Sequence, residues 1–444
     1  MTDTEAPLAA HSATQTHSAT PTHSATPTHS ATPTHRAIEA VWRIESARLV
    51  AGLARLVDDV GLAEELAQDA LLIALEQWPE AGVPDNPGAW LMATAKHRAI
   101  DHLRRRSRYE RKLQEIGRDI ESRPQPDPDA GMDDHIRDDM LRLVLTACHP
   151  ALTTEARVAL TLRLLGGLTT GEIARAFLAT EPAVAQRIVR AKRTLAAKGV
   201  RFEMPSPDDL AERLASVLEV VYLIFNEGYS ATAGDDWTRP DLCHEALRLG
   251  RLLTGLLPGE PEVHGLAALM ELQASRLRAR TGPDGAPVLL PDQDRRLWDR
   301  LLIRRGLEAL ELAESLGGAF GPYALQAAIA ACHARAARLE DTDWERVAAL
   351  YRVLAHVAPS PVVELNRAVA VAMAGDPARG LEIADAVADD KALRGYPQLP
   401  AVRGDLLARL GRTDEARREF ERAASLTANE RERALFLARA ADCG

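Results

Sequence analysis

The chain has 444 residues and a mass of 48.2 kDa, more than one hydrophobic core usually organises, so we expect two to four domains. Hydrophobic residues make up 46% of it and charged residues 27%, as in ordinary soluble globular proteins. No apolar run approaches the roughly 20 residues of a membrane span, no apolar stretch follows Met1 as in a signal peptide, and four cysteines are too few for a disulfide framework, so we expect a cytoplasmic protein.

The charge is unevenly distributed along the chain. The formal net charge of −10 argues, taken alone, against a nucleic-acid partner, but DNA binding needs only a basic face. Residues 86–112 hold eight Lys and Arg against two acids, and residues 186–201 hold six with no acid. Between them, residues 114–139 hold nine acids against three bases. The order basic, acidic, basic is the first indication of function.

Three stretches have the composition of tails or linkers. Residues 1–35 contain HSATQT and then three copies of HSATPT, which cannot bury enough apolar surface to offset the entropy of ordering, so the sequence predicts a disordered tail. The acidic stretch 113–135 and the Pro-rich stretch 201–207 are predicted linkers. The remainder is predicted to be all-α, because Ala, Leu, Arg and Glu dominate it and strand-like alternation is absent. The predicted domains are 36–112, 136–200 and 208–444.

The first predicted domain contains two helices joined by a Gly/Pro-rich loop. Residues 61–78 combine an apolar stripe with an acidic face that includes Glu64, and we expect Pro79 to end this helix. Asn86 is expected to cap the second helix, which starts at Pro87. One side of the second helix is apolar and the other combines a tryptophan with several cations, which suits phosphates and an unpaired base. The alternative is a packed tryptophan beside arginines that only keep the surface soluble.

The second predicted domain contains a helix-turn-helix. Thr169 and Glu172 form the pattern of a capping box that opens a short helix through Phe177, and after a tight turn Thr180 is expected to cap a second helix. The inward positions of the second helix, spaced by 4, 3 and 4, are Val184, Ile188, Ala191 and Leu195. Its outward positions carry Gln and Arg, which suit base edges and phosphates in a major groove. A plain helical hairpin is the alternative, and the lack of acids in 186–201 favours DNA binding.

The last predicted domain has the pattern of stacked helix pairs. Gly375 and Gly411 each mark a turn between two helical stretches and lie 36 residues apart, close to the 34-residue period of tetratricopeptide repeats. Such stacks build concave binding surfaces, so we expect an interaction or regulatory module. Residues 281–291 are a predicted hairpin-like loop. Three Cys-His dipeptides, at residues 148, 243 and 332, lack the close pairing of zinc sites, and we expect no metal and no cofactor.

Short motifs follow one another in a fixed order from residue 36 onward. The first domain contains Ala63-Glu-Glu-Leu-Ala-Gln-Asp-Ala70, Trp78-Pro79, Asp85-Asn-Pro-Gly-Ala-Trp-Leu91 and Arg98-Ala-Ile-Asp-His-Leu-Arg-Arg-Arg106. The second contains Thr146-Ala-Cys-His-Pro-Ala-Leu152, Glu172-Ile-Ala-Arg-Ala-Phe177 and Ala185-Gln-Arg-Ile-Val-Arg-Ala-Lys-Arg193. The extension contains Tyr222-Leu-Ile-Phe-Asn-Glu-Gly-Tyr229, Gly321-Pro-Tyr323 and Leu365-Asn-Arg-Ala-Val369. Together they resemble the extracytoplasmic-function (ECF) sigma factors of bacterial RNA polymerase, in the subgroup with a tetratricopeptide-like C-terminal extension.

The resemblance implies partners and site residues. Residues 36–112 would be a sigma region 2-like domain and residues 136–200 a region 4-like domain, with RNA polymerase core enzyme and promoter DNA as partners. The residues implied in core polymerase binding are Glu65, Gln68, Asp69 and Trp78. Those implied at the −10 element are Asn86, Trp90, Lys96, His97, Arg98, Asp101, Arg104 and Arg105. Those implied at the −35 element are Thr180, Gln186, Arg187, Arg190, Lys192 and Arg193. The acidic linker resembles one that passes near the polymerase active site.

Three functions are weighed at this point. The first is a sigma factor that starts transcription at specific promoters, with a regulatory extension that contacts the sigma domains. The second is a helix-turn-helix regulator with a tetratricopeptide sensor that does not bind core polymerase. The third is a tetratricopeptide scaffold whose basic stretches are incidental. We do not expect an enzyme, because the sequence has no Gly-rich phosphate loop and no nucleophile elbow.

Overall fold

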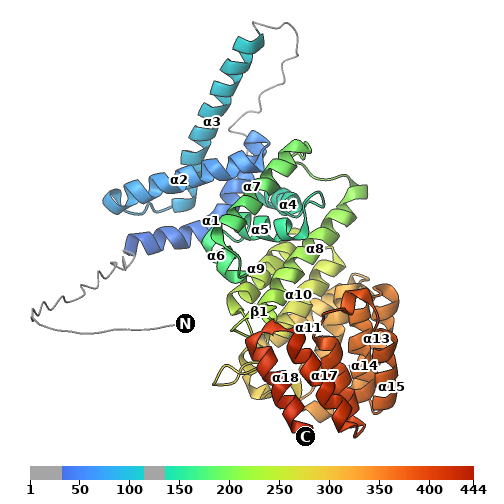
Figure 1. The fold of residues 1–444 in the computed structure, drawn as a ribbon. Coiled ribbons are helices and arrows are strands. Elements are labelled where there is room, and N and C mark those ends of the chain that lie inside the picture. Colours follow the sequence, from blue (N-terminus) through green and yellow to red (C-terminus); the bar gives the residue numbers. More distant parts are fainter. Residues whose placement is uncertain (1–32, 115–135) are drawn as a thin grey trace, which may run out of the picture.

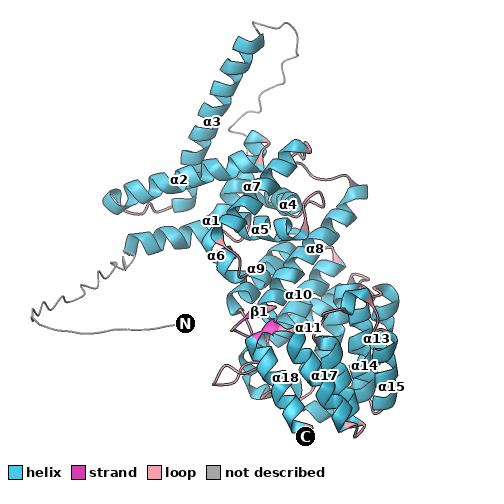
Figure 2. Cartoon of the chain, viewed as in Figure 1, coloured by secondary structure: helices cyan, strands magenta, loops and turns pink. Residues whose placement is uncertain are grey.

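The computed structural model describes residues 33–114 and 136–444, so most of the predicted tail and of the predicted acidic linker lie outside the described residues. Within these ranges the fold is helical, as predicted, with eighteen α-helices and two strands of two residues each (Figure 2). None of these helices combines the length and the hydropathy that a membrane crossing requires.

The helices fall into three groups along the chain. The first group is α1 (Pro33–Val57), α2 (Val60–Ala81) and α3 (Pro87–Gln114). The second group is α4 (Ile136–Ala147), α5 (Thr154–Leu164), α6 (Thr170–Ala176) and α7 (Glu181–Ala197). The extension contains α8 (Pro207–Tyr229), α9 (Pro240–Leu256), α10 (Pro261–Ala274), α11 (Arg300–Ser315), α12 (Pro322–Arg335), α13 (Trp344–Val357), α14 (Pro361–Met373), α15 (Pro377–Ala386), α16 (Gln398–Arg409), α17 (Thr413–Leu426) and α18 (Glu430–Asp442).

Local sequence fixes the ends of α2 and α3. Asp59 begins α2 by accepting a hydrogen bond from the backbone N–H of Leu62, at 2.9 Å. The prediction that Pro79 ends this helix is wrong, because α2 continues to Ala81. A proline near the end of a helix removes only the hydrogen bond of its own nitrogen, and the helix stops instead at Gly82, whose φ is 85°. The predicted cap of α3 is confirmed, since Asn86 Oδ1 accepts from the N–H of Ala89.

The predicted helix-turn-helix is formed by α6 and α7. The capping box is confirmed, because the side chains of Thr169 and Glu172 each accept from the backbone N–H of the other residue. The turn contains Leu178 in the left-handed region, with φ 48°. Thr180 does precede α7, but its side chain makes no capping hydrogen bond, so this detail of the prediction is wrong. Glu181 instead accepts from Thr170 Oγ1 and ties α7 back to α6.

The extension is a stack of antiparallel helix pairs, as predicted. Gly375 and Gly411 have φ of 114° and 74°, which L side chains rarely adopt, and they make the turns of the pairs α14–α15 and α16–α17. The predicted hairpin-like loop is also present, with Thr281 and Pro287 as antiparallel partners.

Both ends of the stack are joined by a short parallel strand pair. Strand β1 (Ala233–Gly234), after α8, pairs with β2 (Ala428–Asn429), before α18. The buried side-chain amide of Asn429 donates to the carbonyl oxygens of Ala231 and Asp236. Because β1 and β2 are almost 200 residues apart in sequence, the C-terminal helices return to the start of the extension (Figure 1).

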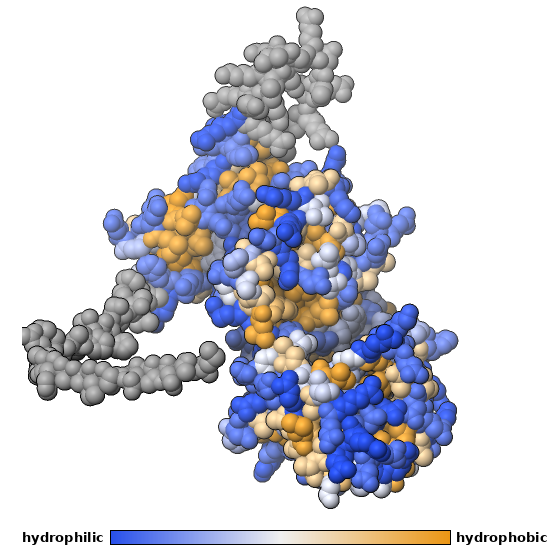
Figure 3. All heavy atoms as spheres, in the orientation of Figure 1, coloured by the Kyte–Doolittle hydropathy of each residue, from blue (hydrophilic) through white to orange (hydrophobic). Residues whose placement is uncertain are grey.

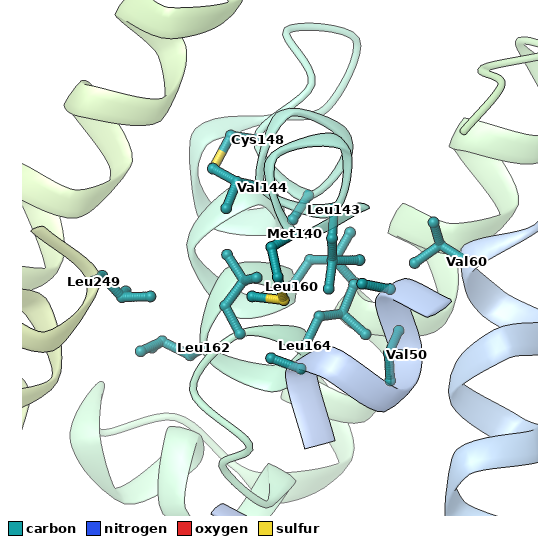
Figure 4. Packing of buried hydrophobic residues seen from close by; sticks show 14 of the residues in the cluster. Val50, Val60, Met140, Leu143, Val144, Cys148, Leu160, Leu162, Leu164 and Leu249 are labelled. Carbon is teal, nitrogen blue, oxygen red and sulfur yellow. The ribbon is translucent and has the colours of Figure 1, made fainter. Parts of the chain in front are cut away.

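One hydrophobic core runs through all three groups of helices. It includes Val50 of α1, Val60 of α2, Leu143 of α4, Leu162 of α5 and Leu249 of α9, and Figure 4 shows these side chains in a single cluster. The predicted inward face of α7 is confirmed, because all four predicted positions are buried in this core. The first group of helices therefore packs against the second through α1 and α4, and the second packs against the extension through α4, α5, α8 and α9. Apolar contacts of this kind are the main favourable term in folding.

Two glycines of the extension give a test of how closely its helices pack. A Cβ added at Gly265 of α10 would lie 2.7 Å from the backbone nitrogen of Ala324 in α12, whereas one at Gly255 of α9 would meet no atom within 4 Å. Gly265→Ala is therefore expected to destabilise the protein by about 1–3 kcal/mol through overpacking. Gly255→Ala is expected to be neutral or stabilising by up to about 1 kcal/mol through helix propensity. Urea unfolding followed by circular dichroism measures both, and equal midpoints would contradict the close approach of α10 and α12.

Candidate nucleic-acid interface

The exposed face of α3 carries most of the residues predicted to contact the −10 element. His97, Arg98, Asp101, Arg104 and Arg105 are exposed, as is Asn86 at the start of the helix. Trp90 and Lys96 are half-buried, and the Trp90 ring packs edge-on against Trp78 with the ring centroids 5.3 Å apart. Trp90 therefore packs against the protein through part of its ring, and its contact with an unpaired base stays a prediction.

The polar face of α2 is adjacent to α3. Glu65 is exposed and Gln68 and Asp69 are half-buried, and Arg98 donates to Asp69 Oδ2 at 2.7 Å. Trp78, expected on the polymerase-binding surface, is only 2% exposed and stabilises the packing of α2 on α3 in this conformation. The large size of this ring gives the reason, since burying it removes a large apolar area from water.

Sequence reasoning missed the apolar part of the α2 surface. Leu72 is 57% exposed on the outside of α2, and Figure 3 shows apolar residues gathered on the visible face there. A leucine at an outward helical position that no core contact requires was the indication available in the sequence.

The recognition helix α7 presents three of the predicted −35 residues to solvent. Gln186, Arg190 and Arg193 are exposed, as is Thr180 before the helix. Arg187 and Lys192 are half-buried and face the rest of the protein. Four of the six predicted residues are therefore exposed to solvent, and the other two, Arg187 and Lys192, contact other parts of the protein.

Lys192 has a carboxylate partner on α2. The side chain of Glu64 is buried, at 4% exposure, and forms ion pairs with Lys192 of α7 and with Arg163 of α5, whose Nε lies 2.6 Å from Glu64 Oε1. Gln68 donates to the same oxygen. The expectation that Glu64 lies on a solvent-facing acidic side of α2 is wrong, because two cations from the second group of helices compensate its charge and allow its burial.

Glu64 brings both predicted DNA-contacting helices to one segment of α2. Glu64 contacts Lys192 of α7, and Asp69, five residues later on the same helix, contacts Arg98 of α3. At 1.5 Å per residue these two acids are separated by about 7.5 Å along the helix axis. Cations of α3 and α7 thus both pair with α2 in this conformation.

The extension also makes polar contacts with the second group of helices. Arg157 of α5 donates to Glu219 of α8 at 3.0 Å and also bonds Ser216 of the same helix. Arg248 of α9 donates to the backbone oxygen of Leu165 at 2.5 Å. Arg239 at the start of α9 bonds both Glu227 and the backbone oxygen of Ala176 in α6. These contacts surround the apolar core that the two parts share.

The cysteines of the three Cys-His dipeptides lie apart from one another. Cys148 follows α4, Cys243 lies in α9 and Cys332 in α12, and all three are buried. Burial raises the pKa of the Cys148 and Cys243 thiols to about 12, so both stay protonated at neutral pH. Across residues 33–114 and 136–444, no group of three or more His, Cys, Asp or Glu is arranged to hold a metal ion.

A helix-turn-helix with exposed Gln and Arg, joined to a helical domain whose last helix is basic, defines a DNA-binding transcription protein. Comparison with known families agrees. Sigma-70 region 2 matches residues 44–109, Sigma-70 region 4 matches residues 142–195, and a family of unknown function (DUF6596) matches residues 213–314.

Relatives of the chain fall into two kinds. The uncharacterized protein R00370 of Rhizobium meliloti (strain 1021) is 47% identical over 387 residues, which cover 87% of this chain and 90% of the relative. The ECF RNA polymerase sigma factor SigC of Mycobacterium tuberculosis (strain CDC 1551 / Oshkosh) and the probable RNA polymerase sigma-C factor of Mycobacterium bovis (strain ATCC BAA-935 / AF2122/97) are each 28% identical over 160 residues. These cover 35% of this chain and 76% of each relative. The chain belongs to the ECF sigma factors, and within them to those with a helical C-terminal extension.

The buried carboxylate of Glu64 leads to a stability prediction. Glu64→Gln removes the negative charge and leaves Arg163 and Lys192, both half-buried, without an anionic partner, so we expect a loss of about 2–4 kcal/mol. The matched control Glu65→Gln changes the exposed neighbour and should stay within about 0.5 kcal/mol of the original protein. Urea unfolding of both variants measures the difference. If Glu64→Gln is as stable as Glu65→Gln, the ion pairs do not hold α2 to α5 and α7.

Proposed function

We propose that this sigma factor directs RNA polymerase core enzyme to specific promoters by binding the −10 element with α3 and the −35 element with α7. The exposed Gln186, Arg190 and Arg193 on the second helix of a helix-turn-helix are the observation that carries this proposal. Glu65, Gln68 and Asp69 on α2 would dock on the polymerase, together with the exposed Leu72. A protein with these partners works in the cytoplasm.

The distance between the two promoter elements implies that the conformation described here is a closed one. Elements centred about 25 base pairs apart are separated by about 85 Å of B-DNA at 3.4 Å per base pair. Arg98 of α3 and Lys192 of α7 are held instead by two acids that lie only five residues apart on α2. Simultaneous contact with both elements therefore requires the Glu64 ion pairs to open. Polymerase binding would favour opening, because the residues proposed to bind polymerase lie on α2, next to Glu64.

The extension is proposed to regulate this opening. Its helices α8 and α9 contact α5 through Arg157, Glu219 and Arg248, and they share the apolar core with α4 and α5. A module that holds the helix-turn-helix domain in this way can set how readily the domain leaves α2. It would thereby take the place of a separate inhibitory protein.

A direct test of the proposed function uses purified core enzyme. Run-off transcription with the full chain should give defined start sites, and footprinting should protect both promoter elements. The competing function, a helix-turn-helix regulator with a sensor domain, predicts DNA binding without co-purification of core polymerase. Failure to associate with core enzyme would therefore favour the regulator.

The −35 contact is tested by Arg190→Ala. If Arg190 contacts a base or phosphate in the major groove, the variant loses about 1–3 kcal/mol of DNA affinity, or about 5- to 150-fold. A phosphate contact would also lower the salt dependence of binding by about one charge. Arg409→Ala, an exposed arginine at the end of α16, is the matched control and should bind as the original protein does. Fluorescence anisotropy with −35 DNA measures both, and equal loss in the two variants would exclude a specific role of Arg190.

The regulatory role of the extension is tested by Arg248→Ala. This variant removes a hydrogen bond from α9 to the backbone of Leu165, so it should loosen the domain and raise transcript yield at limiting core enzyme by about two- to fivefold. Arg304→Ala is the control, because Arg304 is exposed on α11 and pairs only weakly with Glu308 of the same helix. An unchanged yield in Arg248→Ala, with the control unchanged, would contradict a restraining role for this contact.

A further inference from the structure

A large cavity lies between the helix-turn-helix domain and the inner surface of the extension. Its volume is about 1040 Å³, the upper end of the range for ligand-binding sites. One wall comes from α5, α6 and α7, with Val158, Phe177 and Arg187 among its residues. The opposite wall runs along the extension from α8 to α18. The promoter-binding and polymerase-binding roles proposed above do not use this space.

Primary amides line the cavity on successive inner helices of the extension. They are Asn226 of α8, Gln273 of α10, Gln326 of α12, Asn366 of α14 and Gln398 of α16. Helix α10 packs against α8 and α12, and α14 packs against α16, so several of these amides come from neighbouring helices. Packed helices lie about 8–10 Å apart, which an extended polypeptide covers in about three residues.

The amides keep capacity for a ligand. A primary amide carries two N–H donors and a carbonyl oxygen with two lone pairs. Gln326 accepts from Tyr222 and donates to Pro322, while Gln398 donates to Glu432 at 2.6 Å, and each of these contacts uses only part of that capacity. Asn366 is exposed on the cavity wall. An amide of this kind can donate to a peptide carbonyl and accept from a peptide N–H.

Tyrosine rings add flat apolar surface with neutral hydroxyl groups. Tyr222, Tyr229, Tyr351 and Tyr396 line the cavity. Burial raises the pKa of Tyr222 and Tyr396 above its ordinary value and that of Tyr351 to about 12, so these hydroxyls stay protonated at neutral pH. They offer donors without charge, beside rings against which small side chains or proline can pack.

The charged groups of the lining have opposite charges or hydrogen-bond partners within the protein. Glu227 is paired with Arg239 at 2.5 Å, and the buried Glu432 accepts from Gln398 and Thr427. The pKa of Glu155 lies below its ordinary value. The causes are hydrogen bonds to its carboxylate from its own backbone N–H and from Thr153, and the nearby positive charge of Arg187. A ligand therefore meets amides, hydroxyls and apolar groups, and hydrogen bonds or ion pairs to protein groups already engage the carboxylates of Glu227 and Glu432.

We propose that this cavity binds an extended, uncharged segment of another protein, with the amides of α8, α10, α12, α14 and α16 pairing with its main chain. Nucleic acid would require several cations, and Arg187 is the only Lys or Arg among the lining residues of the described chain. A fatty ligand would leave the remaining donors and acceptors of these amides without hydrogen bonds. An extended main chain satisfies the amides at intervals, and small neutral side chains suit the tyrosine rings.

Such a ligand would contact both walls of the cavity. Arg187 and Phe177 belong to the helix-turn-helix domain and Asn366 to the extension, so a bound segment would bridge the two parts. Only this coupling to promoter recognition rests on the proposed function, whereas peptide binding itself does not. Binding and transcription are therefore measured separately.

Selection from a random peptide library tests the site. Random twelve-residue peptides displayed on phage are selected against the full-length protein, and enriched peptides are synthesised with a fluorophore and titrated by anisotropy. We expect enriched sequences to share an uncharged run and to lose about tenfold in affinity in Asn366→Ala, through a lost pair of main-chain hydrogen bonds. The control Gln77→Ala removes an exposed amide of α2, outside the cavity, and should bind unchanged.

Several outcomes would overturn the proposal. They are the failure to enrich any peptide, equal affinities for Asn366→Ala and Gln77→Ala, and selection of charged peptides whose binding disappears with salt. Circular dichroism melting checks that Asn366→Ala folds as the original protein does. A second variant, Tyr396→Phe, removes only a hydroxyl and should also weaken binding. If transcription fails with core enzyme but peptide binding follows the expected pattern, the binding site stands and the sigma role does not.

Discussion

A single buried carboxylate links the two parts of this protein that carry the predicted DNA-binding helices. Glu64 belongs to α2, yet its two cationic partners come from α5 and α7, which carry the other half of the DNA-binding apparatus. Burying a carboxylate costs free energy unless opposite charges compensate it. If α2 separated from α5 and α7 without a new partner or water for these charges, Glu64 and its two cations would lose this compensation. The same property makes the contact reversible, because water or a new partner can take over each charge once the interface opens.

The apolar core explains why the extension cannot be treated as an independent appendage. Leu249 of α9 packs in the same cluster as Val50 of α1 and Leu162 of α5. Separating the extension would expose this apolar area. Separating α1 and α2 from the helix-turn-helix domain would expose another part of it, because α1 packs against α4 in the same cluster. Moving α3 away from α7 therefore has to break apolar contacts as well as the Glu64 ion pairs.

Sequence patterns predicted local structure well and long-range partners poorly. The capping box at Thr169 and Glu172, the inward face of α7 and the turns at Gly375 and Gly411 depend on neighbours within a few residues, and the structure has all of them. The burial of Glu64 depends on Arg163 and Lys192, which lie 99 and 128 residues further along the chain, and helical periodicity alone placed it on the solvent side. The amide-lined cavity was missed for the same reason, because its residues come from helices spread over more than 200 positions.

The strand pair β1–β2 has a consequence for how the extension can change. An open stack of helix pairs tolerates gain or loss of a repeat at its free end, since each repeat touches only its neighbours. Here Asn429 fastens the last helices to the loop after α8, so the stack is closed into a ring of fixed circumference. Adding or deleting one pair of helices would pull Asn429 away from Ala231. The closure therefore favours a constant number of helices in this extension, with variation by substitution of side chains.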